Sequence, residues 1–388
     1  MTEPRTIGFL ANTSWFLANF RFADMIEAKK LGLRVLAIAP EDEYSKKFAE
    51  GGIEFIPVFF KRRDFSPWGK WKTVRALKDI YERESIDLMH LFTLEAILAG
   101  SLAAGKNGPK VVHSVAGMGF AYSGQQLSRR VLRAGLNPFM KRCLPKGPVI
   151  VENDGDRHRV LEIMGPRAKF PVVRLPGGGI DIEKFTPDGP VALKRESDKV
   201  RFLLAGRLLR DKGAGLFAEA VKQYAGPEAE FLVAGMPDEG NPDSFTREEV
   251  EEWTNIPGFR WLGNVDDMPS LLRSVDVLVH PTFYGEGLPR IIMEAAASGL
   301  SVITTNIPAC AETIKHGTNG WILDRKDPTQ LATMMADAAS HPEIWEEMKI
   351  RNRKQAETEF DQRRVIRATQ NVYRNHFPEW HPVTELSQ

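Results

Sequence analysis

The stretch VDVLVHPTFYGEGLPRIIMEAAASGLSVITTN, residues 275–306, decides the fold. Its apolar run up to His280 predicts a strand, Pro289 is typical of the first turn of a helix, and the run 301–304 predicts a second strand. A strand, a helix and a second strand in this order are typical of a βαβ unit, whose strands are parallel. Because parallel sheets are covered by helices on both faces, the stretch predicts an α/β fold.

The same alternation continues on both sides of this stretch. A helix is expected over 19–30, and consecutive helices are expected from about Asp327 onward. The Gly- and Pro-rich segment LPGGGIDIEKFTPDGP, residues 175–190, favours a connection between two doubly wound halves. The expected strands of the two halves are 7–11, 33–39, 53–59, 87–91, 111–115 and 149–152, then 201–205, 230–234, 260–262, 275–279, 301–304 and 321–323.

Composition excludes several classes of protein. The 388 residues favour two domains, and 52 Lys and Arg against 51 Asp and Glu give no overall charge for binding nucleic acid. Cys143 and Cys310 alone exclude a disulfide framework or a cysteine zinc site and favour a reducing cytoplasm. The N-terminal stretch has no apolar run typical of a secretory signal, and no run of about 18 apolar residues predicts a membrane span.

Residues 286–294 hold the first candidate site, since open α/β sheets bind ligands where their strands end. The amides of Gly287 and Leu288, next to a helix that starts at Pro289, favour a phosphate. Glu286 and Glu294 are candidates for the same crevice, and Glu294 could accept hydrogen bonds from a vicinal diol. The alternative is that both glutamates are solvated residues of the helix surface.

The stretch FLLAGRLLRDKG, residues 202–213, holds the second candidate site. A strand ends at Gly206, Arg207 follows, and Lys212 stands at the start of the next helix. The planar fork of an arginine with the point charge of a lysine suits the two phosphates of a diphosphate. The alternative is a pair of surface cations that flank a turn.

Together these motifs resemble the donor-site signatures of family 4 retaining glycosyltransferases of GT-B fold. The resemblance covers essentially the whole chain and includes Gly263-Asn264-Val265, the GGGID segment before Phe185, and the turn 317–320. The segments GFLANTSWFLANFR (8–21) and HSVAGMGFAYSG (113–124) are most similar to the bacterial enzymes that elongate polyprenyl-diphosphate-linked saccharides.

The resemblance implies two Rossmann-like domains facing an interdomain cleft. Residues 1–175 would form the acceptor-binding domain, rejoined by a C-terminal helix at about 362–388, and 185–361 the nucleotide-sugar domain. Arg207 and Lys212 would hold the diphosphate, Glu294 the ribose, and Glu286 the donor sugar, so that Glu286, Arg207 and Lys212 are the expected catalytic residues. The remaining donor-site residues it implies are Gly206, Gly263, Asn264, Val265, Gly287, Leu288 and Pro289. Neither a metal nor another cofactor is expected.

The acceptor side departs from the family pattern. Many relatives carry His-Gly after the strand at 111–115, where this chain has Ala116 and Gly117. The side chain of His113 could point to the core or to the cleft, and the same alternatives hold for His90. The acceptor-side candidates are Asn12, Ser14, His90, His113 and Gly117.

Two acidic groups suggest a metal at first sight. Asp154-Gly155-Asp156 follows an apolar run, but we interpret it as the acidic cap of a helix that begins near Arg157. His280, Glu286 and Glu312 match no familiar zinc spacing.

A basic segment extends from residue 96 to residue 151, without any Asp or Glu. Apolar residues interleave with its cations, which predicts a peripheral contact with an anionic membrane surface. The alternative is a basic helix whose apolar side packs on the first sheet; nucleic acid is disfavoured because no nucleic-acid-binding module accompanies the segment. The cations are Lys106, Lys110, Arg129, Arg130, Arg133, Lys141, Arg142 and Lys146.

The resulting hypothesis is an enzyme of bacterial surface polysaccharide or glycan biosynthesis. It would transfer a hexose or N-acetylhexosamine from a nucleotide diphosphate donor, UDP being favoured, to a lipid-linked saccharide with retention. The expected location is the cytoplasm, or the inner face of the cytoplasmic membrane. The alternatives are a nucleotide-sugar epimerase or hydrolase, and a non-catalytic subunit that binds nucleotide sugar or lipid.

Overall fold

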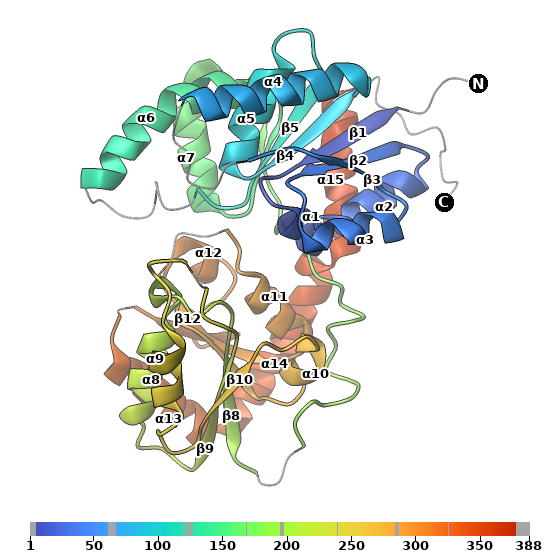
Figure 1. Cartoon of the computed structure of the whole chain (residues 1–388). Helices are drawn as coiled ribbons and strands as arrows, with labels where there is room; N and C mark the ends of the chain where they lie inside the picture. The colour runs from blue at the N-terminus through green and yellow to red at the C-terminus, as the bar shows by residue number, and fades with distance from the viewer. Residues whose placement is uncertain are drawn as a thin grey trace. The chain divides into compact units, whose positions relative to one another are not determined.

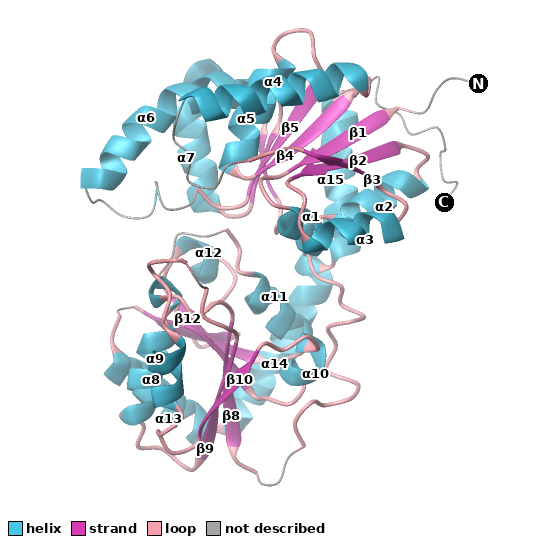
Figure 2. Ribbon diagram, viewed as in Figure 1, coloured by secondary structure: helices cyan, strands magenta, loops and turns pink. Residues whose placement is uncertain are grey.

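The chain divides into two compact units in a computed structural model. The model describes residues 5–60, 67–118, 122, 127–167, 169–194, 198–238, 240–283, 287–324 and 326–377. The first unit comprises Met1–Gly178 and Arg363–Gln388, and the second comprises Gly179–Gln362 (Figure 1). Each unit contains its own parallel sheet with helices on both faces, as the apolar strands predicted (Figure 2).

The described residues of the first unit form a seven-stranded parallel sheet. Its register places Ile7 opposite Val35 on one side and opposite Leu88 on the other. The strands run across the sheet in the order β3 (Glu54–Pro57), β2 (Arg34–Ala39), β1 (Thr6–Leu10), β4 (Leu88–Phe92), β5 (Lys110–Val115), β6 (Val149–Val151) and β7 (Val172–Arg174).

Helices cover both faces of this sheet. One face packs against α4 (Pro67–Arg83), α5 (Leu94–Ala104), α6 (Leu127–Cys143) and α7 (Asp154–Met164). The other packs against α1 (Ser14–Phe20), α2 (Phe22–Lys30), α3 (Lys46–Glu50) and α15 (Gln362–His376). The C-terminal helix thus completes the core of the first unit through buried Val372 and Tyr373.

The structure differs from the sequence-based expectations at three places. The helix expected over 19–30 is split into α1 and α2 at Arg21, whose backbone leaves the helical region at φ −129° and ψ 1°. The side chain of Arg21 is buried and donates to the carbonyl of Gly177, 3.0 Å away. Strand β7 was not predicted, and α7 begins at Asp154 rather than near Arg157, because the Asn153 side chain caps it by accepting from the Asp156 amide at 2.7 Å.

The described residues of the second unit form a six-stranded parallel sheet. The order is β10 (Phe259–Gly263), β9 (Ala229–Ala234), β8 (Val200–Ala205), β11 (Val277–His280), β12 (Ser301–Thr305) and β13 (Gly320–Leu323). One face packs against α8 (Ala214–Lys222), α9 (Arg247–Trp253) and α13 (Pro328–Ser340). The other packs against α10 (Met268–Leu272), α11 (Arg290–Ala297) and α12 (Pro308–Ala311), and α14 (Pro342–Gln355) lies beside α11 and α13.

The two segments that connect the units run side by side where they leave the second unit. The Ile180 amide donates to the Phe360 carbonyl at 2.7 Å, and the Gln362 amide donates to the Ile180 carbonyl at 2.9 Å. A Cβ atom on Gly179 would lie 2.6 Å from the Cα of Gln362, so only glycine allows this approach. A π-helical turn, Ala356–Phe360, precedes the crossing and links α14 to α15.

Candidate active site

The motifs singled out in the sequence gather at one edge of the second sheet. The order of that sheet reverses between β8 and β11, which pair with each other. Residues 206–213 follow β8 and residues 281–283 follow β11, so both segments start at the carboxyl ends of the two strands between which the order reverses. Open α/β sheets bind ligands at such a reversal.

The loop after β8 presents Arg207. The Gly206 amide donates to the carbonyl of Ala234 at 3.0 Å, which ties the start of the loop to the end of β9. The guanidinium of Arg207 is exposed, at 59%, and donates to the Asp238 carboxylate at 3.2 Å. Because an exposed pair of this kind contributes about 1 kcal/mol or less, an anionic ligand can replace Asp238 as the partner of Arg207.

The loop after β8 packs directly on the loop after β11. The Phe283 amide donates to the Asp211 carbonyl at 2.8 Å. Gly213 has φ +83°, and a Cβ atom there would lie 2.1 Å from the carbonyl oxygen of Pro281. Lys212, the last residue of a short 3-10 turn, is therefore held next to the second loop. The two motifs, about 70 residues apart in sequence, form one cluster.

Helix α11, which begins just after the second loop, carries a largely buried carboxylate. The side chain of Glu294 is only 13% exposed and accepts from Nε of Arg290 at 2.8 Å. Burial raises the pKa of Glu294, while the charges of Arg290 and Lys184 oppose this rise. A carboxylate this buried is not a solvated residue of the helix surface, so that alternative is wrong for Glu294.

The third predicted segment joins the same edge at the end of β10. The Gly235 amide donates to the Gly263 carbonyl at 2.7 Å, and Gly263 itself has φ +67°. The side-chain amide of Asn264 donates to the Asp266 carboxylate at 2.9 Å, and Val265 packs, partly buried, on the apolar cluster that includes α11. Segment 263–265 therefore lies one strand beyond the loop that carries Asp238.

Part of the predicted donor site stays a prediction. Glu286 lies outside the described residues. Gly287 and Pro289 are buried and Leu288 is half-buried, packed on the cluster of apolar residues under α11. The role of the Gly287 and Leu288 amides as phosphate ligands therefore remains a proposal.

The two candidate histidines of the acceptor side, His90 and His113, are core residues. His90 is fully buried, with Nδ1 2.6 Å from the Tyr373 hydroxyl and Nε2 2.7 Å from the Ser114 hydroxyl. His113 is also fully buried, with Nε2 2.9 Å from the Ser101 hydroxyl. Burial lowers the pKa of both imidazoles, to about 4 for His113, and keeps them neutral. Of the two alternatives, the one in which the side chain points to the core is therefore confirmed for both histidines.

The other acceptor-side candidates lie where β1 and β5 end. The side-chain amide of Asn12 donates to the Glu95 carboxylate at 3.1 Å. Ser14 is buried and donates to the Pro40 carbonyl, which gives it a structural partner at the end of β2. Gly117 is half-buried and has φ +83°, which explains a glycine in the turn after β5.

The acidic groups have structural partners. Asp156 is buried and accepts from the Asn153 amide group at 2.9 Å, in the first turn of α7, as the cap interpretation expected. In the part of the chain that the structure describes, no three His, Cys, Asp or Glu side chains lie close enough together to hold a metal ion. Nor is any helix of that part both long and apolar enough to cross a membrane.

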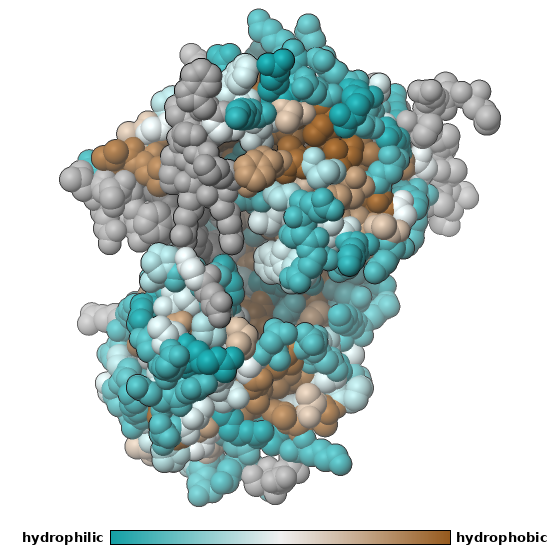
Figure 3. Space-filling model, viewed as in Figure 1, coloured by the Kyte–Doolittle hydropathy of each residue, from teal (hydrophilic) through white to brown (hydrophobic). Residues whose placement is uncertain are grey.

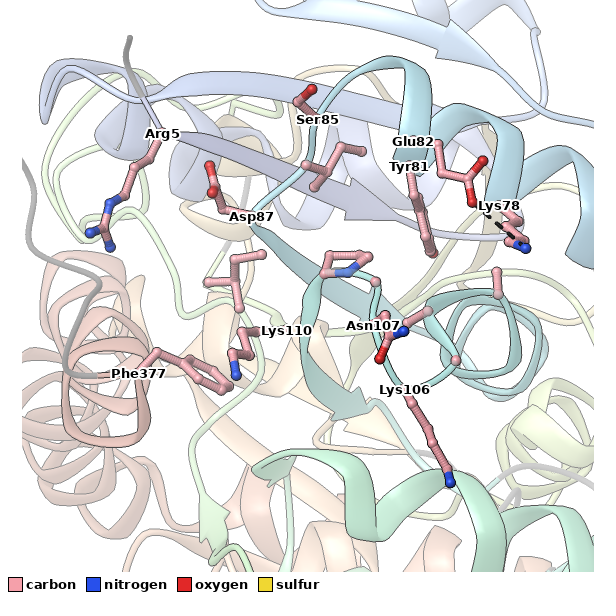
Figure 4. A pocket seen from close by; sticks show the side chains of 17 residues that line it. Arg5, Lys78, Tyr81, Glu82, Ser85, Asp87, Lys106, Asn107, Lys110 and Phe377 are labelled. Carbon is pink, nitrogen blue, oxygen red and sulfur yellow. Dashed lines mark ion pairs between the residues drawn. The ribbon is translucent and has the colours of Figure 1, made fainter. Parts of the chain in front are cut away.

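A cavity of about 750 Å³ lies at the opposite end of the first sheet (Figure 4). Asp87 and Lys110, at the starts of β4 and β5, line it together with Phe377 after α15. Its carboxylates are engaged: Asp87 accepts from the Thr6 amide at 2.8 Å, and Glu82 pairs with Lys78 at 3.6 Å. Because it lies at the amino ends of the strands, the cavity includes none of the predicted donor-site or acceptor-side residues, although Lys106 and Lys110 of the basic segment line it.

Each of the two units matches a family model of known proteins. The family model described as glycosyl transferases group 1 matches residues 199–341, and the model described as glycosyl transferase 4-like matches residues 6–143. An N,N'-diacetylbacillosaminyl-diphospho-undecaprenol alpha-1,3-N-acetylgalactosaminyltransferase of Campylobacter jejuni is 25% identical over 338 residues, 84% of this chain and 87% of that protein. A UDP-Gal:alpha-D-GlcNAc-diphosphoundecaprenol alpha-1,3-galactosyltransferase of Escherichia coli is 27% identical over 70% of this chain and 71% of its own length.

Solved structures share the fold over nearly the whole chain. Sucrose-phosphate synthase from Thermosynechococcus elongatus superposes with a TM-score of 0.80 at 18% identity, covering 97% of this chain and all of that one. Anabaena HepE in complex with UDP superposes with a TM-score of 0.75 at 17% identity, covering 96% of this chain and all of that one. The chain therefore belongs to the family 4 glycosyltransferases of GT-B fold and is a sugar-transferring enzyme.

Proposed function

We propose that the enzyme transfers a sugar from a UDP-sugar to a polyprenyl-diphosphate-linked saccharide, with retention, in the synthesis of bacterial surface polysaccharides or glycans. Two relatives that align over most of their length are named for undecaprenyl-diphosphate-linked acceptors, and one of the names gives UDP-Gal as the donor. In this proposal the second unit binds the nucleotide sugar and the first unit binds the acceptor.

The observation that carries the proposal is the cluster at the strand reversal of the second sheet. Its two loops are held together by the Phe283 amide on the Asp211 carbonyl and by the close approach of Gly213 to Pro281. The cluster therefore presents Arg207 and Lys212 from a fixed backbone. Such preorganised cations stabilise the charge that develops on a leaving diphosphate, and loss of one donor of this kind costs about 10²-fold or more in rate.

In the proposal the nucleoside of the UDP-sugar donor binds next to α11. A vicinal diol donates its two hydroxyl protons, and a carboxylate is a bidentate acceptor for them. Glu294 lies on α11, is only 13% exposed and already accepts one hydrogen bond, from Arg290. In the proposal Glu294 binds the ribose in its ionised form, and Glu286 with the amides of Gly287 and Leu288 contacts the donor sugar.

The proposed reaction needs no protein nucleophile. The bond between the anomeric carbon and the diphosphate oxygen breaks, the acceptor hydroxyl oxygen bonds to the same face of that carbon, and the acceptor proton passes to the leaving diphosphate. Arg207 and Lys212 balance the charge that the diphosphate gains. We therefore propose that the transfer requires no metal, which transfer assays in EDTA would test: loss of activity would contradict it.

Acceptor-dependent release of UDP tests the proposed function. The assay would offer UDP-sugars in turn, with undecaprenyl-diphosphate-linked N-acetylglucosamine and related lipid-linked saccharides as acceptors. The proposal predicts UDP release only when donor and acceptor are both present. Release without acceptor would show a hydrolase, a changed donor sugar without release would show an epimerase, and UDP binding without turnover would show a binding subunit.

We also propose that α6 contacts an anionic membrane surface. One side of α6 is buried in the core of the first unit, with Met140 and Cys143 at 1% and 0% exposure, as the packing alternative expected. A second apolar side stays exposed, with Val131 at 67% and Phe139 at 52% (Figure 3). The other exposed residues of α6 near Val131 and Phe139 are Arg130, Ala134, Gly135, Pro138, Lys141 and Arg142.

The composition of this second side favours anionic lipid as its partner. Exposed apolar groups flanked by cations are typical of helices that lie in a membrane interface, and each cation near an anionic surface contributes about 1 kcal/mol. Cosedimentation with vesicles of phosphatidylglycerol and phosphatidylcholine would measure the binding. Phe139→Ser and Lys141→Glu should each weaken it. Ile350→Ser should not, although Ile350 of α14 is an even more exposed apolar residue, at 72%. Equal binding to pure phosphatidylcholine would contradict the proposal.

A further inference from the structure

The first sheet has a strand reversal of its own. Its order changes direction between β1 and β4, just as the second sheet changes direction between β8 and β11. In the second unit this position holds the candidate donor site. The corresponding position of the first unit lies at the carboxyl ends of β1 and β4, and the general rule for open α/β sheets places a ligand there as well.

Two polar side chains meet at this position. Asn12 follows β1 and Glu95 lies in the first turn of α5, which follows β4. The side-chain amide of Asn12 donates to the Glu95 carboxylate at 3.1 Å, across 83 residues of sequence. Both residues are half-buried. The pair offers an amide and a carboxylate at one point of the sheet edge.

The backbone between β4 and Glu95 is strained. Thr93 has φ +67° and ψ 149°, a region that is almost exclusive to glycine and costs a β-branched residue about 1–3 kcal/mol. Its side chain does not cap α5, and its hydroxyl has no hydrogen-bond partner among the described residues. No local hydrogen bond of the side chain offsets the strain. Backbone strain of this size is concentrated at functional sites.

An exposed indole follows at the same end of the sheet. Trp15 lies in the first turn of α1, three residues after Asn12, and is 44% exposed. The helix start is fixed by Thr13, whose side chain accepts from the Phe16 amide at 3.2 Å. Phe20 supports the indole edge to face, with ring centroids 5.1 Å apart. The structure therefore holds a large aromatic face in place without burying it.

We propose that Trp15, Asn12 and Glu95 form a subsite for the saccharide of the acceptor, an inference that rests on the proposed function. A pyranose has a face of C–H groups, which packs on an aromatic ring, and hydroxyls, which donate to a carboxylate and exchange hydrogen bonds with an amide. The carboxylate of Glu95 repels a diphosphate, so the subsite takes the uncharged sugar ring rather than the anionic part of the acceptor. Glu95 and Asn12 set which hydroxyls are recognised.

Steady-state kinetics with a detergent-free acceptor test the inference. The probe is N-acetylglucosamine linked through diphosphate to a short farnesyl chain, used with the UDP-sugar that the transfer assay identifies. Trp15→Ala should raise the KM for this acceptor about tenfold or more, with the affinity for UDP unchanged within twofold. Trp15→Phe should recover most of the loss, and Glu95→Gln should raise the acceptor KM about tenfold.

The matched control is Trp71→Ala, which removes an indole of α4 that is 56% exposed. It should leave both kinetic constants unchanged. Acceptor KM values within twofold of wild type for Trp15→Ala and Glu95→Gln, with transfer intact, would overturn the subsite, as would a fall in kcat alone. A wild-type enzyme that binds UDP but transfers to no lipid-linked saccharide would instead overturn the proposed function, and the subsite with it.

Discussion

Gly213→Ala should weaken nucleotide binding, although Gly213 itself is not one of the proposed ligand-binding residues. Gly213 has φ +83°, and the added methyl group would lie 2.1 Å from the Pro281 carbonyl oxygen. Ordinary contacts are about 3.5 Å or longer, so the loop after β8 and the loop after β11 must separate by about 1 Å. This separation moves Lys212 relative to α11.

The expected loss in the free energy of unfolding has two parts. A left-handed backbone costs alanine about 1–2 kcal/mol. Overpacking against a backbone atom adds about 1–3 kcal/mol, which gives about 2–5 kcal/mol in all. A displacement of about 1 Å at the diphosphate site should also weaken UDP binding, since a misplacement of that size can cost a catalytic site about 10²-fold in rate.

Calorimetry with UDP and thermal unfolding would measure both effects. The control is Gly317→Ala in the same unit, because Gly317 has a similar φ of +71° but nothing within 4 Å of the added methyl group. The control should lose about 1–2 kcal/mol of stability and no UDP affinity. The reasoning is refuted if Gly213→Ala binds UDP within twofold of wild type, or if the control loses as much affinity.

Three further predictions follow from charged groups. Burial raises the pKa of Asp24 to about 6, so Asp24→Asn should stabilise the fold by up to about 3 kcal/mol at pH 8. This gain should shrink as the pH falls from 6 to 4, because the buried carboxyl of the wild type is then protonated; a gain that is constant in urea unfolding from pH 4 to 8 would contradict this. Asp238→Asn should raise UDP affinity up to about fivefold in calorimetry, because it removes the carboxylate that competes for Arg207; a tenfold loss would show instead that Asp238 positions the guanidinium. Since burial raises the pKa of Glu294, UDP affinity should fall on acidification at a higher pH than for an ordinary glutamate, and Glu294→Gln should remove this dependence.

The sheets were predictable because their strands are buried on both faces. Strand β4, for example, has no exposed residue, so its apolar run stands out in the sequence. Strand β7 did not stand out, because it has only three residues and its last, Arg174, is exposed. The break between α1 and α2 at Arg21 could not be predicted from the sequence either, since it is accompanied by a hydrogen bond to Gly177, 156 residues away.

The candidate donor site was largely predictable because each of its motifs is local. The run 202–213 carries Arg207 and Lys212 together, and the run 275–306 carries Glu294 with the helix that positions it. The packing of Gly213 on Pro281, which joins the two runs, appears only in three dimensions. The subsite in the first unit was missed in part for the same reason: Asn12 was a candidate, but its partner Glu95 lies 83 residues away.

The most direct test of the central claim is calorimetric titration of UDP, GDP and ADP into the wild type and into Arg207→Ala. Arg207 is exposed and its pair with Asp238 contributes little to stability, so the variant should fold. The account predicts that UDP binds in preference to GDP and ADP. It also predicts that UDP affinity falls about 10- to 100-fold in the variant, because a hydrogen bond to a charged group contributes about 1.5–3 kcal/mol. Failure of the wild type to bind any nucleotide, or equal UDP affinity in the variant, would contradict it.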